Sequence, residues 1–277
     1  MSTPDPGPTV SLLGVPYDVH SSFLRGPAGA PAAVRAALDC GSTNWCAESG
    51  RDLGPLRGER WHDLGDLELG QEVLPALHAI RTAAEHAIAD GGRLLSIGGD
   101  HLVAWPLVQA MTGRYDELTV LHFDAHPDLY HELDGDRYSH ACPFARIMEE
   151  GKVARLVQFG IRTMTPHQRD QANRFGVEVY EARTGMISID DLRGPVYVSI
   201  DIDVLDPAFA PGMSHYEPGG WSSRQLLDAI AAIKAADVSV VGADLVEINP
   251  QRDVNDLTAM VGAKIVRELL DLLLTSP

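Results

Sequence analysis

Four apolar segments of the sequence each end in acidic residues or histidines, the side chains that bind metal ions and transfer protons. The segments are LLSIGGDH, LTVLHFDAHPD, VYVSIDIDVLDP and VVGADLVEINP, and their polar residues are Asp100 and His101, Asp124, His126 and Asp128, Asp201 and Asp203, and Asp244 and Glu247. In an open parallel sheet, ligands bind outside the carboxyl ends of the strands. Four such strands would therefore bring these side chains together, although they lie far apart in the sequence.

So many carboxylates at one sheet edge predict bound cations, because mutual repulsion and desolvation are both costly. The acidic and histidine residues of DAHPD alternate, so they point to one side if the strand stays extended, and Asp-Ile-Asp repeats this spacing. Ligation by oxygen and two imidazoles, without thiolate, favours Mn²⁺ over structural zinc. We predict two Mn²⁺ ions with shared carboxylates, and the candidate ligands are His101, Asp124, His126, Asp128, Asp201 and Asp203.

Each motif alone also has a purely structural interpretation. Paired glycines mark turns, and an Asp at the end of a strand often caps the next helix. An Asp-x-Asp sequence after a strand occurs in many folds. The combination of these motifs with DAHPD favours metal binding over that interpretation.

Short apolar runs alternate with helical patterns along the chain, which is typical of βαβ units on a parallel sheet. Several runs lack alternation, as expected when helices cover both sheet faces. We predict a single α/β domain over residues 1–277, a three-layer α/β/α sandwich with a central, mostly parallel sheet. The expected strands are Val10–Val15, Arg93–Ile97, Leu118–Phe123, Leu156–Ile161, Gly176–Tyr180, Val196–Ile202 and Val238–Ala243. The expected helices are Val73–Ala89, Gln225–Ala236 and Leu257–Leu274.

Composition narrows the class of protein. Lys and Arg number 22 against 39 Asp and Glu, and the resulting net charge of −17 argues against a nucleic-acid partner. Three cysteines without C-x-x-C spacing indicate free thiols in a reducing compartment. No apolar stretch reaches the length of a transmembrane helix, and the N-terminal residues show neither a signal peptide nor an Arg- and Ser-rich transit pattern. We therefore expect a cytoplasmic protein without a membrane partner.

The GGDH, DAHPD and SIDIDVLDPAFAPG motifs resemble the three metal motifs of the ureohydrolase family, which contains arginase and agmatinase. The resemblance covers nearly the whole chain and is closest to the plant-type arginases. The stretches that carry it further are SSFLRGPAGAP with CGSTN, HPDLY, YSHACPFARIMEEG, APGMSHYEPGG and NPQRDVNDLTAMVGAKIVREL.

Position by position, the resemblance implies that the six candidate residues are ligands of two Mn²⁺ ions per subunit. It implies that His140 is a catalytic histidine that transfers a proton, and that Glu247 binds the guanidinium. We expect Asp128 both to hold a metal and to aim the attacking hydroxide. The segments His126–Tyr130 and Asp134–Asp136 match substrate contacts, and the residues concerned are His126, Tyr130, Asp134, Gly135 and Asp136.

The resemblance implies release of urea from a small cationic guanidino substrate, and we expect L-arginine, giving L-ornithine. Agmatine or another guanidino compound is the alternative, and the acidic segment Leu129–Ser139 bears on the choice. Formimidoylglutamate hydrolysis, a non-catalytic family member and a one-zinc deacetylase-like enzyme are further alternatives. The resemblance also implies a homotrimer or homohexamer.

Three other residues near the motifs are of types that could take part in the chemistry. His122 is expected to face the side of the strand opposite to Asp124 and to be structural. His215 could line the mouth of the pocket or pack within its loop. Cys142 lies two residues after His140, but no separate orienting group is evident, so we interpret it as a small buried residue.

Overall fold

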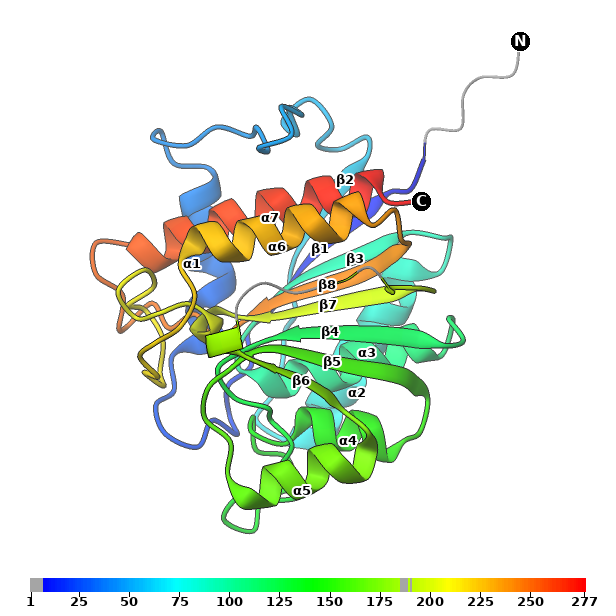
Figure 1. Ribbon diagram of the computed structural model, residues 1–277. Helices are drawn as coiled ribbons and strands as arrows, with labels where there is room; N and C mark the ends of the chain where they lie inside the picture. The colour runs from blue at the N-terminus through cyan, green and yellow to red at the C-terminus, as the bar shows by residue number, and fades with distance from the viewer. Residues whose placement is uncertain (1–6, 185–188, 190) are drawn as a thin grey trace.

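Eight parallel strands form one sheet through the centre of the molecule in the computed structural model, which describes residues 7–184, 189 and 191–277 (Figure 1). Their order across the sheet is β2-β1-β3-β8-β7-β4-β5-β6. The strands are β1 Val10–Val15, β2 Trp61–Asp66, β3 Arg93–Gly98, β4 Leu118–Phe123, β5 Val153–Ile161, β6 Glu178–Glu181, β7 Val196–Asp201 and β8 Val240–Val246. Every pairing between these described strands is parallel.

Helices cover both faces of the sheet (Figure 1). The helices on one face are α1 Ala30–Leu38, α6 Ser223–Ala235 and α7 Leu257–Thr275, and those on the other face are α2 Val73–Ile88, α3 Ala104–Thr112, α4 Pro143–Glu149 and α5 Pro166–Phe175. Short 3₁₀ turns are η1 Pro27–Gly29, η2 His101–Val103, η3 Ala182–Thr184 and η4 Ile202–Val204. Two apolar cores result, one on each side of the sheet. The predicted three-layer α/β/α architecture is confirmed.

The central strands β3, β4, β7 and β8 are buried at every position. Burial on both faces explains why their sequences are mainly apolar and do not alternate between apolar and polar residues. The edge strand β2, with the sequence WHDLGD, was not predicted because its residues alternate between buried or half-buried and exposed positions and half of them are polar. Helices α1, α3, α4 and α5 were not predicted either. The three predicted helices correspond to α2, α6 and α7 within two residues at each end.

Two local features fix the loops at the carboxyl edge of the sheet. Helix α5 begins with a capping box in which Thr165 and Gln168 each bond to the other's backbone. Gly99 lies so close to the loop after β1 that a Cβ there would be 1.8 Å from the carbonyl oxygen of Tyr17. The second glycine of GGDH therefore allows that loop to pack against the end of β3. Among the described residues, no helix is long and apolar enough to cross a membrane.

Candidate functional site

The polar residues of the four motifs meet at the carboxyl ends of β3, β8, β7 and β4, which are neighbours in the sheet. His101 begins the turn η2 directly after β3, and Asp124 follows β4. Asp201 is the last residue of β7, and Asp203 lies within η4. Glu247 follows β8 by one residue. The topology therefore places on one edge the side chains that the sequence separates.

One group of ligand atoms surrounds the imidazole of His101. Its Nδ1 lies 3.1 Å from Oδ2 of Asp124, 3.2 Å from Oδ2 of Asp128 and 3.2 Å from Oδ2 of Asp201. This nitrogen is buried, yet none of these contacts has hydrogen-bond geometry and no other described residue bonds to it. A buried imidazole nitrogen that faces three carboxylate oxygens without a hydrogen bond fits a metal ligand.

A second group of ligand atoms lies beside the first. Nδ1 of His126 is 3.0 Å from Oδ2 of Asp203 and 3.4 Å from Oδ1 of Asp124. Ligand atoms of Asp124, His126 and Asp203 all lie within 4.8 Å of one another. Asp124 presents one oxygen to His101 and the other to His126, so its carboxylate connects the two groups of ligand atoms. The donor set of oxygen and imidazole fits divalent cations.

The carboxylates of this site also destabilise one another in the absence of a counter-charge. Burial, together with the charges of Asp203 and Asp124, raises the pKa of Asp201 well above its usual range. Burial and the charge of Asp124 raise the pKa of Asp203 to about 6. Both shifts disfavour the ionised form. The site is thus built to gain from bound positive charge.

Asp244 supports the site rather than joining the ligand group. Ser199 donates to Oδ1 of Asp244 at 2.7 Å, and Tyr197 donates to its Oδ2 at 2.7 Å. Oγ of Ser199 lies 3.0 Å from Nε2 of His101. This chain of contacts holds the ring of His101 so that Nδ1 faces the carboxylates, as partners beyond the ligands do in metal sites.

His140 and Glu247 form a hydrogen-bonded pair beside the cluster. Nδ1 of His140 lies 2.7 Å from Oε1 of Glu247, and its Nε2 lies 2.8 Å from Oγ of Ser22. The same Glu247 oxygen accepts the backbone N–H of His101 at 2.9 Å. Burial alone would lower the pKa of His140, but the charge and hydrogen bond of Glu247 outweigh it and raise the pKa to about 9. The pair therefore combines a carboxylate with a protonated imidazole.

Two of the acidic residues have a backbone conformation that side chains other than glycine rarely adopt. The φ angle is 47° at Asp128 and 64° at Glu247. Such left-handed residues cost free energy and are concentrated at functional sites. The condition that DAHPD stays extended is not met: β4 ends at Phe123, and Asp128, with its left-handed backbone, reaches the cluster from beyond the strand.

A cavity of about 180 Å³ opens onto the cluster and the His140–Glu247 pair. Its walls are Ser22, His126, Asp128, Tyr130, Leu133, His140, Ala141, Thr163, Thr165, Gln168, Asp201, Asp203, His215 and Glu247. Asp134 and Gly135 are not among these wall residues and lie in an exposed turn, with φ angles of 52° and 81°. Asp136 is not a wall residue either, and its Oδ2 lies 2.6 Å from Nδ1 of His20.

Several wall residues were not predicted, because they lie outside the metal motifs, on loops and in the first turn of α5. They are Ser22, Leu133, Ala141, Thr163, Thr165 and Gln168. The T-x-x-Q spacing of the α5 capping box was a readable signal for a helix start at Thr165. Two roles were left open for His215, lining the pocket or packing within its loop. His215 lines the cavity, and its ring lies 5.1 Å from the ring of His140.

The expectation for His122 is wrong. Residues two apart in a strand point to the same side, and Nε2 of His122 lies 2.7 Å from Oδ2 of Asp124. Cys142 is fully buried, and burial together with the charge of Asp128 raises the pKa of its thiol to about 12. A thiol that stays protonated is a poor nucleophile, which agrees with a packing role.

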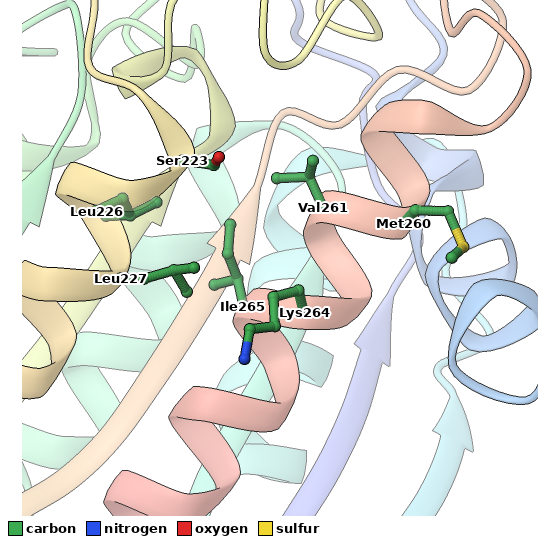
Figure 2. A pocket seen from close by; sticks show the side chains of 7 residues that line it. All are labelled: Ser223, Leu226, Leu227, Met260, Val261, Lys264 and Ile265. Atoms are coloured by element: carbon green, nitrogen blue, oxygen red, sulfur yellow. The ribbon is translucent and has the colours of Figure 1, made fainter. Parts of the chain in front are cut away.

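A second cavity, of about 200 Å³, lies between α6 and α7 (Figure 2). Figure 2 shows side chains from both helices around it, and its lining residues are Ser223, Leu226, Leu227, Met260, Val261, Lys264 and Ile265. This set is mainly apolar and contains no histidine, cysteine or carboxylate. It therefore lacks the carboxylate, imidazole and thiolate groups that commonly bind metal ions in proteins.

Comparisons with known proteins agree with this geometry. Arginase 1, mitochondrial, from Arabidopsis thaliana is 45% identical over 94% of this chain and 80% of its own length. An agmatinase from Bacillus anthracis is 35% identical over 94% of this chain and 90% of its own length. The solved structure of an arginase from Medicago truncatula has a TM-score of 0.86 at 42% identity, covering 96% of this chain and 88% of the other.

The names of these relatives contradict the expected cytoplasmic location. Arginases from Arabidopsis thaliana that match over 94% of the chain are named mitochondrial and chloroplastic/mitochondrial. That expectation rested on composition and on the absence of a recognisable targeting pattern in the sequence. The model of the arginase family matches residues 8–271. With its sequence relatives and its fold in agreement, the chain belongs to the arginase family, whose members are hydrolases of amidine C–N bonds.

Proposed function

We propose that this chain hydrolyses L-arginine to L-ornithine and urea with two Mn²⁺ ions. The observation that carries the proposal is the shared cavity, in which two histidine–carboxylate groups joined by Asp124 face the His140–Glu247 pair. Relatives named arginase, at 43–45% identity, support the choice of substrate. The domain that performs this reaction would span residues 1–277.

The donor atoms divide between two metal positions. His101, Asp128 and the near oxygen of Asp124 would hold one cation, and His126, Asp203 and the other oxygen of Asp124 would hold the second. Asp201 faces the first group and lines the cavity. Bound divalent cations supply a water of lowered pKa as the nucleophile and positive charge that stabilises developing negative charge.

Glu247 is suited to receive the guanidinium. Its Oε1 is occupied by His101 and His140, whereas Oε2 accepts no hydrogen bond from any described residue and Glu247 lines the cavity. A carboxylate pairs favourably with the N–H groups of a guanidinium. Glu247 would thus orient the guanidino carbon toward the metal ligands, with Asp128 on the cavity wall to aim the attacking oxygen.

His140 would supply the proton that the departing amine requires. Its raised pKa keeps the imidazole protonated near neutral pH, and Glu247 holds it at the cavity wall. Oγ of Ser22 on the other ring nitrogen provides a route for reprotonation from the loop side. Proton transfer by a positioned histidine is general acid catalysis.

Agmatine is the second candidate substrate. Among the cavity residues there is no lysine or arginine that would bind an α-carboxylate. For L-arginine, that carboxylate would depend on neutral donors such as Tyr130, Thr163 and Thr165. The 35% identity to a protein named agmatinase also supports agmatine as a candidate substrate.

A urea-release assay on Mn²⁺-loaded protein tests the proposal, with L-arginine, agmatine and guanidino acids compared at equal concentration. We expect the highest kcat/KM with L-arginine. A higher value with agmatine assigns the second candidate, and the absence of urea from every substrate overturns both. Reconstitution with Ni²⁺ and Co²⁺ in parallel tests the metal, and light scattering of the same protein tests the proposed homotrimer or homohexamer.

A further inference from the structure

His122 occupies the centre of the molecule, directly behind the ligand that the two metal positions share. It is fully buried in β4, and its Nε2 lies 2.7 Å from Oδ2 of Asp124. Its ring stacks on Phe144 with the ring centres 3.8 Å apart. Gln158, its partner in the register between β4 and β5, is also fully buried.

The amide of Gln158 fixes which nitrogen of His122 carries the proton. Nε2 of Gln158 lies 2.6 Å from the carbonyl oxygen of Pro127, which accepts only, so this atom is the donor nitrogen. The same NH₂ group lies 2.9 Å from Nδ1 of His122. Because two N–H groups cannot share one contact, Nδ1 is the acceptor. The hydrogen of His122 is therefore on Nε2 and points at Asp124.

We propose that Gln158 and His122 form a positioning relay that sets the orientation of the Asp124 carboxylate and thereby the affinity of the site for its metal pair. The proposal rests on the metal centre of the proposed function. In the relay, Pro127 accepts from Gln158, Gln158 donates to His122, and His122 donates to Asp124. Partners of this kind behind a ligand hold it in the geometry that the metal needs.

A different role for His122, as a direct metal ligand, conflicts with the same contacts. His101, His122 and Asp124 do bring their ligand atoms within 4.8 Å of one another. A ligating Nε2 would need a free lone pair, however, which moves the hydrogen to Nδ1 and directs it against the Gln158 NH₂ group. The geometry thus favours a donor to Asp124 over a seventh ligand.

Two substitutions of His122 separate the hydrogen bond from simple packing. His122→Gln keeps an N–H donor at about the reach of the imidazole Nε2 but loses the ring that stacks on Phe144. His122→Phe keeps an aromatic ring there but donates nothing. A role in packing alone predicts that the Phe variant is the better of the two, whereas the relay predicts that the Gln variant is.

The readout is the affinity of the full-length protein for Mn²⁺, measured by the electron paramagnetic resonance signal of free Mn²⁺ during titration. Loss of a partner behind a ligand weakens metal binding by about 10- to 100-fold. We expect that loss in His122→Phe and a smaller one in His122→Gln. Equal affinities of the Phe variant and the unmodified chain would overturn the relay, as would a Phe variant that binds better than the Gln variant.

Gln158→Met provides the test if His122→Phe does not fold. It removes the amide but leaves His122 and all six ligands in place, and we expect Mn²⁺ affinity to fall about 10-fold or more. Gln171→Met is the matched control, because Gln171 is equally a buried glutamine but lies in α5 and contacts Arg174. Equal affinities of both methionine variants contradict the relay.

The kinetic result separates the relay from the function itself. If the unmodified chain binds no pair of Mn²⁺ ions, the proposed function and the relay both fail; if it binds them and the variants bind them equally well, the relay alone fails. If it binds them, we expect Gln158→Met to regain most of its kcat at saturating Mn²⁺ with little change in KM, because neither relay residue lines the cavity. A KM increase without loss of metal affinity rejects a role through Asp124.

Discussion

Nδ1 of His140 lies 2.7 Å from Oε1 of Glu247, although the two residues are 107 positions apart in the sequence. The residue proposed to deliver a proton and the residue proposed to receive the guanidinium are therefore one hydrogen-bonded unit. Each determines the charge state of the other: Glu247 raises the pKa of His140, and His140 lowers that of Glu247 against the opposing effect of burial. Substitution of either residue should thus alter the charge state of the other.

Replacement of His140 by Asn should lower turnover while the metal content stays the same. A positioned acid contributes about 10²- to 10⁴-fold to rate, and His140 contacts Glu247 and Ser22 rather than the metal ligands. Urea release gives kcat, and elemental analysis of the same sample gives the metal content. An unchanged kcat removes His140 from the reaction.

Replacement of Glu247 by Gln should mainly raise KM. The amide oxygen can still accept the His101 N–H, but the variant loses the charge that would pair with the guanidinium. Hydrogen bonds to charged groups contribute about 1.5–3 kcal/mol, so KM should increase about 10- to 100-fold. Glu68→Gln, at an exposed position, is the control. Full activity in Glu247→Gln would refute the assignment of Glu247 as the residue that binds the guanidinium.

Binding of Mn²⁺ should strengthen as pH rises from 5 to 7.5. The pKa of Asp203 is raised to about 6 and that of Asp201 is raised well above its usual range, so in the metal-free protein these carboxyls hold protons that a cation must displace. Raising the pH removes the competitor, and affinity should grow about tenfold per pH unit for each proton displaced. Calorimetry in buffers of different ionisation enthalpy measures the protons released. Affinity independent of pH over this range contradicts the shifts.

Gly99→Ala should destabilise the protein because its Cβ would collide with the backbone of Tyr17 at 1.8 Å. Overpacking of this kind costs about 1–3 kcal/mol. Urea denaturation of metal-free protein gives the free energy of unfolding. Gly70→Ala, where a Cβ meets nothing within 4 Å, should leave that free energy unchanged. If both variants match the unmodified chain, the close approach at Gly99 is not a constraint.

The three cysteines should differ in their reaction with iodoacetamide at pH 8. Cys142 is buried and its thiol pKa is raised to about 12, whereas Cys46 is exposed. Because the thiolate is the reactive form, Cys142 should remain unlabelled in the native protein and react only after denaturation. Peptide mass spectrometry gives the labelling at each position. Equal labelling of Cys46 and Cys142 in the native state would show that the site opens readily.

The central strands, and the metal motifs at their ends, could be predicted from the sequence because strands that are buried on both faces are mainly apolar. Strands β4 and β7 are mainly apolar segments that lead into DAHPD and DID. Recognising these strands therefore places Asp124 and Asp201 at their carboxyl ends. Strand β2 gave no such signal, because fewer of its residues are buried at the edge of the sheet. The family predicted from the motifs is confirmed by the comparisons.

The finer geometry of the site depends on loops, and there the sequence carried less information. Asp128 reaches the cluster through a left-handed residue, which a rule of strand alternation does not anticipate. His122 was assigned to the wrong side although the two-residue period of a strand already placed it beside Asp124. Ser22 reaches His140 from a loop 118 positions away, a contact that no local pattern encodes.

The insertion of β8 between β3 and β7 has a consequence for how the protein is made. Residues Val240–Val246 are synthesised after both of their neighbours, Arg93–Gly98 and Val196–Asp201, so a growing chain on the ribosome holds two strand edges without the strand that pairs with both. Exposed edges of this kind invite aggregation and chaperone binding. Translation products that stop short of β8 should accordingly be degraded rather than accumulate as partly active enzyme.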